Sequence, residues 1–301
     1  MGAYRHAKGC KGMPDRNEPE DVVLSLACPD RPGIVHAVSG FFLDHGGDIV
    51  ESQQFGDQLT QRFFMRVQVR FDSLELTETF LQTEFARVAE PLGMEWTLTN
   101  VHHRQRVAIL VSRFGHCLND LLYRWRTGQL PIDIPLIVSN HRDLEPLAQT
   151  YGIPFVHNPV TPDTKREAEQ ELLRLVKEHD IDLVVLARYM QVLSDELCEQ
   201  LAGRAINIHH SFLPSFKGGK PYHQAHDRGV KLVGATAHYV TAELDEGPII
   251  EQEVVRVQHG YTSQDLVVAG RDAECVALAR AVQWHSENRI LLNGHRTVIF
   301  R

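Results

Sequence analysis

The chain lacks the cysteine pattern of a disulfide-bonded or zinc-binding protein. It has 301 residues and five cysteines, none of them in a CxxC pair: Cys10, Cys28, Cys117, Cys198 and Cys275. An odd number of widely separated cysteines supports neither a disulfide framework nor a zinc ribbon. We therefore expect the protein to work in the reducing cytoplasm.

Long apolar runs and an excess of positive charge are also missing. No apolar stretch approaches the roughly 20 residues that cross a bilayer, and residues 1–20 lack the apolar core of a signal peptide. Asp and Glu total 39 against 31 for Lys and Arg, a formal net charge of −8. A nucleic-acid-binding protein normally presents a basic face. We therefore expect neither a membrane nor a nucleic acid among the partners.

The composition that remains is that of a globular protein. Hydrophobic residues make up 43% of the chain and charged residues 23%, which is ordinary for a chain with a buried core. At roughly 150 residues per domain, the length predicts two domains. Residues 1–20 mix Lys, Arg, Gly, Pro, Asp and Glu, and such a segment buries too little apolar surface to offset the entropy of ordering. We predict a flexible tail over residues 1–20.

Residues 21–102 are predicted to form a domain with the element order βαββαβ. Apolar residues recur at helical spacing from Ile34 to Phe42, after a turn at residues 29–33. The remaining pattern predicts a second helix at residues 76–92 and strands at residues 22–26, 48–55, 62–71 and 94–101. This order is that of the ferredoxin-like fold.

Residues 103–301 are predicted to form a second, larger α/β domain. Helices alternate with short apolar strands, which are expected at residues 107–111, 134–138, 153–156, 183–186 and 205–208. The strand at residues 183–186 is apolar throughout, as a parallel strand buried on both faces should be. The alternation predicts a doubly wound, mostly parallel, Rossmann-like sheet.

Three polar residues stand out in this second domain. Asn207 and His209 share one face of the strand that begins at residue 205, because side chains alternate along a strand. They lie at its carboxyl end, where open α/β sheets bind ligands. Asp245 follows in a loop between two later strands. An amide and an imidazolium can donate to an oxyanion, and a carboxylate can keep the imidazole charged, so this set suits carbonyl chemistry.

Each of these residues also has a purely structural interpretation. Asn207 suits the turn after a strand, a single His is more often structural than catalytic, and residues 245–247 form a common turn sequence. A metal site is a further alternative, because His223 and His226 lie three apart on an expected helix. No HExxH or similar ligand set is present, however, and we predict no metal.

Three segments, in order, resemble the folate-dependent formyltransferase family. They are Asn-Ile-His-His-Ser-Phe-Leu-Pro at residues 207–214, Gly-Ala-Thr-Ala-His-Tyr-Val at residues 234–240 and Leu-Asp-Glu-Gly-Pro-Ile-Ile at residues 244–250. That family uses an Asn, a His and an Asp without a metal. The resemblance implies a formyltransferase fold for residues 103–301 and a catalytic role for Asn207, His209 and Asp245.

Residues 183–193 resemble the segment of that family that forms the pterin pocket. The resemblance implies that folate is the substrate and that its contacts are Leu186, Met190, Gln191, Val192, Leu193, Thr241, Ala242, Glu243 and Leu244. A place in the core is equally compatible with Leu186 and Val192. No separate cofactor is implied, because the folate is itself the formyl donor.

The N-terminal domain resembles an ACT regulatory domain through Asp30-Arg31-Pro32-Gly33-Ile34-Val35. ACT domains commonly pair side by side and bind small amino acids near this turn. The resemblance therefore implies a homo-oligomer, a dimer or a tetramer, and an amino-acid effector site at Asp30, Arg31, Pro32, Gly33 and Ile34. An ACT domain before a formyltransferase-like domain is similar to the formyltetrahydrofolate deformylase family. That family hydrolyses 10-formyltetrahydrofolate to tetrahydrofolate and formate, which feeds one-carbon and purine metabolism.

One departure from the family bears on the acceptor. In the glycinamide ribonucleotide formyltransferases a Gly-Ser-Asn loop holds the phosphate of the acceptor, and the matching residues here are Gly115, His116 and Cys117. Loss of the Ser and Asn donors favours water as the acceptor. Formyl transfer to an amine, a metal-dependent amidohydrolase and an amino-acid-sensing protein with a vestigial catalytic domain are the alternatives. The roles of His116, of His210 and of the pair His223 and His226 are left open.

Overall fold

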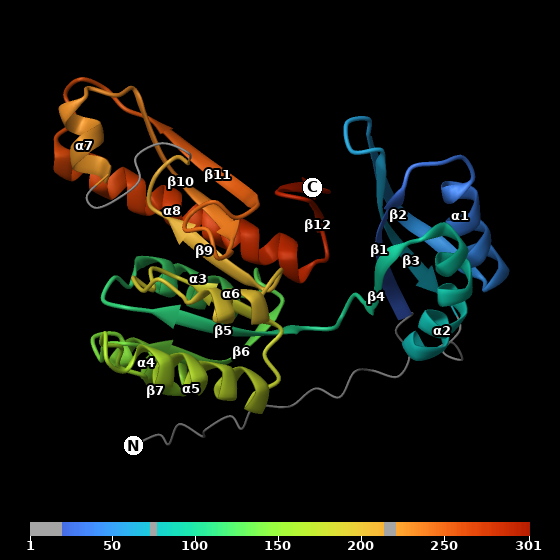
Figure 1. Cartoon of the computed structure of the whole chain (residues 1–301), viewed down its shortest axis with the longest axis horizontal. Coiled ribbons are helices and arrows are strands. Elements are labelled where there is room, and N and C mark those ends of the chain that lie inside the picture. Colours follow the sequence, from blue (N-terminus) through green and yellow to red (C-terminus); the bar gives the residue numbers. More distant parts are fainter. Residues whose placement is uncertain (1–19, 73–76, 214–220) are drawn as a thin grey trace, which may run out of the picture. The chain divides into compact units, whose positions relative to one another are not determined.

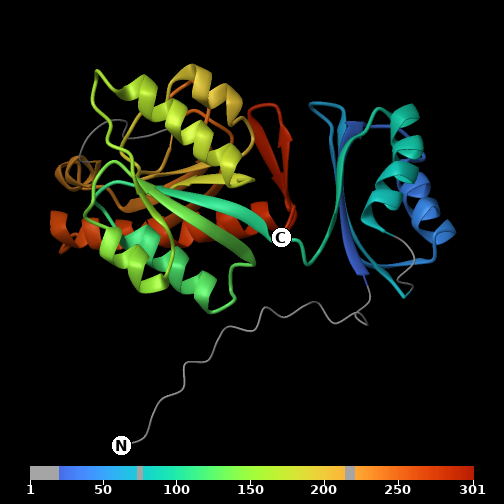
Figure 2. The ribbon, with the colours of Figure 1, turned by 90° about the horizontal axis from the view of Figure 1, so that it is seen from below.

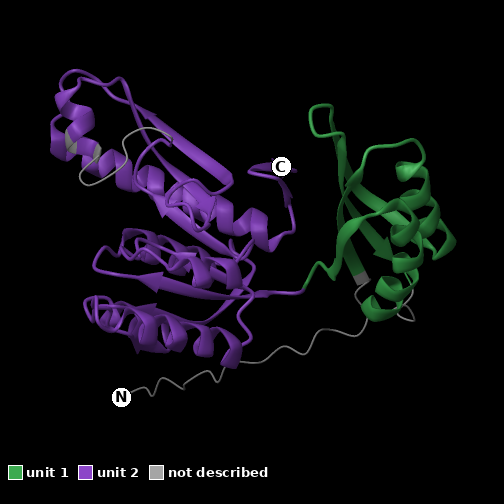
Figure 3. Ribbon diagram, in the orientation of Figure 1, with its two compact units in different colours: residues 1–102 green, residues 103–301 purple. Residues whose placement is uncertain are grey.

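The computed structural model describes residues 20–72, 77–213 and 221–301. The chain forms two compact units that divide between His102 and His103 (Figure 3). The tail predicted at residues 1–20 lies outside the described residues, except that Glu20 already begins the first strand.

The N-terminal unit is a four-stranded antiparallel sheet packed against two helices. Its elements are β1 (Glu20–Pro29), α1 (Ile34–Asp44), β2 (Gly47–Asp57), β3 (Arg62–Phe71), α2 (Glu78–Ala89), the 3₁₀ turn η1 (Glu90–Leu92) and β4 (Glu95–Asn100). The strand order is β2-β3-β1-β4. This arrangement confirms the predicted ferredoxin-like order βαββαβ.

Alternation of apolar residues explains how this sheet packs. Val22, Leu24 and Leu26 of β1 are fully buried and contact Phe42 of α1 and Phe85 of α2 within one apolar cluster. Both helices therefore cover the same face of the sheet (Figure 2). The second helix is shorter than predicted, since its α-helical part ends at Ala89 and a 3₁₀ turn that contains a proline follows.

The C-terminal unit contains the remaining elements in alternating order. They are β5 (Gln105–Val111), α3 (His116–Arg126), β6 (Ile132–Ser139), α4 (Glu145–Tyr151), β7 (Phe155–His157), α5 (Lys165–Glu178), β8 (Leu183–Leu186), α6 (Asp195–Gln200), β9 (Ala205–His209), α7 (Pro221–Asp227), β10 (Leu232–Tyr239), β11 (Ile249–Arg256), α8 (Ser263–Ser286), β12 (Ile290–Asn293) and β13 (Arg296–Ile299). Seven strands form one sheet in the order β11-β10-β9-β8-β5-β6-β7, while β12 and β13 form a hairpin.

Helices cover both faces of this seven-stranded sheet (Figure 1). Residues of α3 and α8 share an apolar cluster with Ile109 of β5 and Val185 of β8. On the opposite face, residues of α5 and α6 share a cluster with Leu110 and Val184. Strands β5 to β9 run parallel to one another, whereas β10 pairs antiparallel with both β9 and β11. The doubly wound, mostly parallel α/β fold is therefore confirmed.

The order of the strands sets the place of the ligand site. The chain runs outward from β5 through β6 to β7, then returns to β8 on the other side of β5. Ligands of such sheets bind at the carboxyl ends of the strands beside this reversal. Here those ends lead into residues 112–115 after β5 and residues 187–194 after β8.

The long helix α8 is an element that the sequence patterns above do not assign. It spans 24 residues and begins with a capping box, in which Thr262 and Asp265 exchange hydrogen bonds. Its buried side chains are mostly small, such as Ala273, Ala277 and Ala281. Among the helices of the described residues, none combines the length and the apolar character needed to cross a bilayer.

Candidate active site

Strand β9 presents two of the predicted catalytic residues at its carboxyl end. Ile206 and Ile208 are buried in the apolar cluster that includes α3 and α8. Asn207 and His209 alternate with them, and both line a cavity beyond the end of the strand. In the antiparallel pairing with β10, Asn207 lies opposite His238. Opposite residues of paired strands have neighbouring side chains, so β10 adds a second histidine to the site.

The loop between β10 and β11 brings Asp245 to the same place. Asp245 has a φ of 58°, in the left-handed region that residues other than glycine adopt at some energetic cost. Gly247 allows the loop to approach β10, because a Cβ at this position would lie 1.8 Å from the carbonyl oxygen of Tyr239. The result is an ion-pair distance of 3.2 Å between Asp245 Oδ1 and His209 Nδ1. The structure thus brings Asn207, His209 and Asp245 together.

His238 links the amide of Asn207 to this pair. Its Nδ1 lies 2.8 Å from the backbone carbonyl oxygen of Tyr239, so Nδ1 carries the donated proton. In the neutral ring Nε2 is then an acceptor, and it lies 3.2 Å from Nδ2 of Asn207. Burial lowers the pKa of His238, which favours this neutral form. The second N–H of the Asn207 amide is left for a ligand.

The electrostatics of the site favour an ionised Asp245. The hydrogen bond with His209 is the main cause that lowers the pKa of Asp245, and the charge of His209 acts in the same direction against partial burial. Burial lowers the pKa of the neighbouring His210 to about 4, so this ring is neutral near pH 7. Within the described residues, the buried Nε2 of His209 has no hydrogen-bond partner. A carboxylate-supported imidazole with one open nitrogen is suited to donating to an oxyanion or moving a proton.

Two adjoining cavities meet at these residues. The larger, of about 530 Å³, is lined by Asn207, His209 and Asp245 together with Met190, Gln191 and Val192. The smaller, of about 60 Å³, is lined by Asn207, His238 and Asp245 and by apolar residues of β8 and the loop after β10. A cavity with mostly apolar walls and a few convergent polar groups is typical of a small-molecule site.

The residues predicted to contact folate lie on these walls, with one exception. Between them the two cavities are lined by Leu186, Met190, Gln191, Val192, Leu193, Thr241, Ala242 and Leu244. Glu243 lines neither cavity, and its carbonyl oxygen instead accepts hydrogen bonds from Thr241 and Glu246 in the turn. Met190, Val192 and Leu244 are exposed apolar side chains at the cavity, as expected where an apolar ligand covers them.

Sequence reasoning did not identify a second polar cluster on the wall of the larger cavity. Glu274 of α8 bonds to His116 Nε2 at 2.7 Å and to the Tyr222 hydroxyl at 3.0 Å, and Arg188 Nη1 lies 3.4 Å from its Oε2. Arg188 lies two residues after the end of β8, at the carboxyl edge of the sheet, and a charged residue at this position could have been recognised in the sequence. Glu274 lies within the unassigned helix, so no pattern pointed to it.

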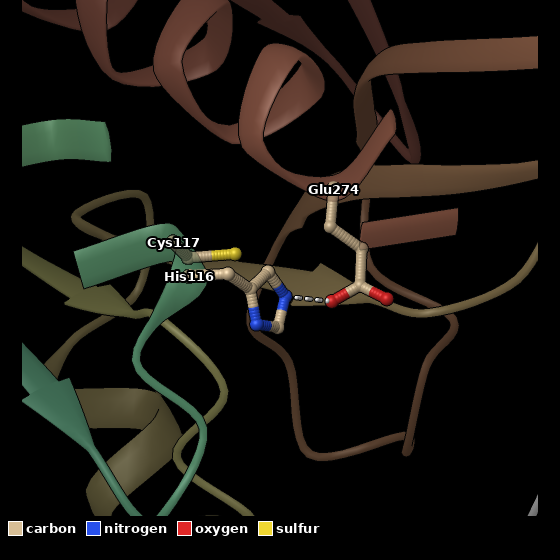
Figure 4. A group of neighbouring side chains, drawn as sticks. All are labelled: His116, Cys117 and Glu274. Carbon is tan, nitrogen blue, oxygen red and sulfur yellow. Dashed lines mark hydrogen bonds and ion pairs between the residues drawn. The ribbon is translucent and has the colours of Figure 1, made fainter. Parts of the chain in front are cut away.

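His116, Cys117 and Glu274 are also the one group in the described residues with a metal-ligand composition (Figure 4). Their ligand atoms lie within 4.8 Å of one another. The hydrogen bond with Cys275 is the main cause that raises the pKa of the Cys117 thiol well above its usual value, which disfavours the thiolate that binds metals. The positive charge of Arg188 beside Glu274 further disfavours the binding of a metal cation. This geometry favours an ion-paired hydrogen-bond cluster over metal coordination.

The predicted effector segment forms the turn between β1 and α1. Gly33 has a φ of 98° and precedes the first residue of α1, Ile34, which is buried. Arg31 Nη2 donates to the carbonyl oxygen of Pro91 at 2.6 Å, and the Asp30 backbone N–H donates to Gln61 at 2.9 Å. The turn is therefore tied to two other segments of the N-terminal unit.

Known proteins share both units of this chain. The formyl transferase family model matches residues 105–282, and the ACT domain model matches residues 22–84. A formyltetrahydrofolate deformylase from Corynebacterium sp. (strain P-1) is 55% identical over 279 residues, which is 93% of this chain and 98% of that protein. The crystal structure of a formyltetrahydrofolate deformylase from Burkholderia mallei is 52% identical with a TM-score of 0.90, and the match covers 94% of this chain and 100% of that one.

The C-terminal unit alone also resembles transferases. The structure of a phosphoribosylglycinamide formyltransferase from Anaplasma phagocytophilum is 33% identical with a TM-score of 0.61, and covers 66% of this chain and 96% of that one. The matches to the two deformylases cover 93% and 94% of this chain, which also carries the match to the ACT domain. The chain therefore belongs to the formyl transferase family and, within it, to the formyltetrahydrofolate deformylases.

Proposed function

We propose that this protein hydrolyses 10-formyltetrahydrofolate to formate and tetrahydrofolate. The observation that carries the proposal is the contact between His209 and Asp245, at 3.2 Å, beside Asn207 at the junction of two cavities. The full-length similarity to formyltetrahydrofolate deformylases supports the same reaction. No cofactor beyond the folate substrate is needed, since water supplies the acceptor oxygen.

In the proposed reaction, the pterin ring occupies the smaller cavity, against Leu186, Val192 and Leu193. The formyl carbon on N10 then lies at the residues that both cavities share. Asn207 directs its remaining amide N–H, and His209 its Nε2–H, towards the carbonyl oxygen. Donors fixed in this way stabilise the oxyanion more than the carbonyl of the substrate.

The bond changes of the hydrolysis balance without an oxidant or a reductant. Water attacks the formyl carbon and a C–O bond forms, while the carbonyl electron pair moves to the oxygen held by Asn207 and His209. Asp245, ionised because its pKa is lowered, accepts the hydrogen bond of the attacking water. The intermediate collapses, the C–N10 bond breaks with its electron pair on nitrogen, and N10 takes up the proton that water lost. The formic acid so formed gives its remaining proton to the solvent, and formate and tetrahydrofolate leave.

A formate-release assay tests this proposal directly. The full-length protein is incubated with 10-formyltetrahydrofolate, with and without amine acceptors, and both formate and formylated amine are measured. We expect formate release that does not depend on an amine. Turnover that requires an amine would show a transferase instead, and no turnover with either would show that the catalytic unit is inactive.

We further propose that the ACT domain binds a small amino acid and assembles the chain into a homo-oligomer, a dimer or a tetramer. The match of residues 22–84 to the ACT model supports this, as do the turn and helix start at residues 30–34. An amino acid linked to one-carbon supply, such as glycine or methionine, is the expected effector. Sedimentation with and without a panel of amino acids tests both parts.

A further inference from the structure

The larger cavity lies on the side from which the nucleophile must come. The two cavities share Asn207, Asp245, Gln191, Val192 and Leu244, where the formyl carbon lies in the proposed function. If the pterin occupies the smaller cavity, whatever attacks the carbon enters through the larger one. The remaining walls of that larger cavity therefore determine which nucleophiles are admitted.

A fixed negative charge forms part of those walls. The Glu274 side chain is only 1% exposed, yet it lines the larger cavity. Burial alone would raise the pKa of Glu274, but the hydrogen bond with His116 and the charge of Arg188 outweigh burial and lower it. The carboxylate is consequently ionised at neutral pH, with His116, Tyr222 and Arg188 around it.

The backbone makes room for the polar cluster around Glu274 at two positions. Gly270, one turn before Glu274 on α8, leaves room for the Tyr222 ring, because a Cβ there would lie 2.0 Å from a ring atom. Arg188 has a φ of 67°, which is costly for a residue with a side chain. Its guanidinium lies over the Phe114 ring, 5.3 Å from the centroid. The missing side chain of Gly270 lets Tyr222 reach Glu274, and the left-handed backbone of Arg188 directs its guanidinium to the same carboxylate.

The carboxylate also contacts the first residue of a helix. His116 is the first residue of α3, and the N-cap residue Gly115 provides no side-chain cap. The N-terminus of a helix attracts anions such as phosphate. In this chain its own His116 is already bonded to Glu274, whose charge also neutralises Arg188. A phosphate that approached this wall would meet the like charge of Glu274, a His116 that is already bonded to it and an Arg188 whose charge it already pairs.

We propose that Glu274, held by His116, Tyr222 and Arg188, is a specificity-determining residue that excludes phosphorylated amines from the nucleophile side of the cavity. Water, which carries no charge, is not excluded by Glu274 and can act as the acceptor. This inference rests on the proposed hydrolysis and deepens it. It also explains why a unit that resembles a phosphoribosylglycinamide formyltransferase serves hydrolysis here.

The test measures how phosphate affects formate release from 10-formyltetrahydrofolate by the full-length protein. The probes are inorganic phosphate and phosphoribosylglycinamide, each at constant ionic strength. The variant Glu274→Gln removes the charge with little change of shape and leaves His116 and Arg188 free to bind an anion. The matched control is Glu251→Gln, a carboxylate that is also buried but pairs with Arg280 and Arg301 away from the cavity.

We expect neither probe to inhibit the wild type or Glu251→Gln in the low millimolar range. In Glu274→Gln the inhibition constant for both probes should fall by about tenfold or more, because an unpaired guanidinium attracts phosphate strongly. Tyr222→Phe, which keeps the charge of Glu274, should stay insensitive. Equal sensitivity of Tyr222→Phe and Glu274→Gln would overturn the role of charge.

Two further outcomes decide the proposal separately from the proposed function. Competitive inhibition of the wild type by phosphate would overturn the proposal even if Glu274→Gln failed to fold. A Glu274→Gln variant with a wild-type melting temperature and no gain in phosphate sensitivity would overturn it as well. In contrast, a wild type that releases no formate at all would refute the hydrolysis itself.

Discussion

Asn207 and His238 face each other across two antiparallel strands, with 3.2 Å between Asn207 Nδ2 and His238 Nε2. The backbone carbonyl oxygen of Tyr239 fixes the His238 tautomer. A side chain that is distant in the sequence thereby sets the direction of the amide that faces the substrate. Asn207 is placed by β9, but it is oriented by β10.

Loss of His238 should impair turnover by disordering Asn207. We expect His238→Ala to lower kcat by about 10- to 100-fold with a smaller change in KM, because a misplaced catalytic group loses its alignment with the reacting atoms. Asn207→Ala should lower kcat by roughly 10²–10³, the usual effect of one oxyanion donor. Steady-state formate release measures both values.

The conservative variant His238→Gln separates the orientation of Asn207 by His238 from any effect of His238 on the stability of the protein. His238→Gln offers an amide oxygen that can accept from Asn207, so it should recover part of the kcat that His238→Ala loses. If His238→Gln and His238→Ala were equally impaired while both melted like the wild type, the orienting role of His238 would be wrong.

Removal of the charge of Asp245 should lower kcat about as much as the loss of the Asn207 amide. Asp245→Asn keeps the size and tolerates the left-handed backbone, but it no longer stabilises a protonated His209. We expect kcat to fall by at least about 100-fold with folate binding retained. Asp227→Asn is the control, since Asp227 is an exposed carboxylate beside His226 on α7. Wild-type turnover in Asp245→Asn would contradict the assigned role.

The close approach of the loop after β10 to the backbone of Tyr239 should depend on Gly247. In Gly247→Ala the added Cβ would lie 1.8 Å from the Tyr239 carbonyl oxygen, so the loop has to move and carry Asp245 away from His209. We expect both a lower melting temperature and a fall in kcat of at least about tenfold. Gly260→Ala is a matched control, because nothing lies within 4 Å of a Cβ at that position. Similar effects of the two substitutions would refute this explanation.

Local patterns in the sequence were sufficient for most of the elements. Continuous apolar residues marked β8, alternating apolar residues marked β9, and the turn at Gly33 marked the start of α1. Strand alternation also placed Asn207 and His209 on one face, beside the end of the sheet. The position of Asp245 in a loop between two later strands made it a candidate for the same site, and the resemblance to the formyltransferases then supplied most of the apolar residues that line the smaller cavity.

The parts that were missed depend on contacts between distant segments. His238 reaches Asn207 through the register of β9 and β10, which no single strand pattern specifies. The buried face of α8 consists largely of alanine and glycine, so its amphipathic signal is weak, and Glu274 was overlooked with it. Glu243, the one predicted folate contact that lines neither cavity, belongs to a turn that uses its backbone carbonyl oxygen.

Stability of the catalytic unit should fall as the solution becomes acidic. Burial lowers the pKa of both His210 and His285 to about 4, against about 6.5 in an unfolded chain. The unfolded state therefore binds more protons as the pH drops through this window. The stability is fully present above pH 6.5 and is lost towards pH 4, at roughly 1–3 kcal/mol for each histidine.

Calorimetry of the full-length protein between pH 7 and pH 4.5 measures this loss. His285 Nδ1 is hydrogen-bonded to the Tyr239 hydroxyl at 2.7 Å, and His285→Gln removes the titration of this side chain. We expect His285→Gln to show a shallower decline than the wild type. His226→Asn, at an exposed position, should decline like the wild type. An unchanged slope in His285→Gln would contradict the assignment of the pH dependence to this ring.

The turn of the N-terminal unit should govern the response to an amino acid. Arg31→Ala removes the hydrogen bond to the Pro91 carbonyl oxygen and frees the turn at residues 30–33, which the proposed effector contacts. We expect the dissociation constant of the effector to rise by about tenfold or more, measured by calorimetric titration of the full-length protein. Arg87→Ala is the control, because Arg87 is an exposed arginine of α2 that pairs with Glu84. Effector binding that weakens equally in both variants, or that no amino acid produces in the wild type, would leave the N-terminal unit with an assembly role alone.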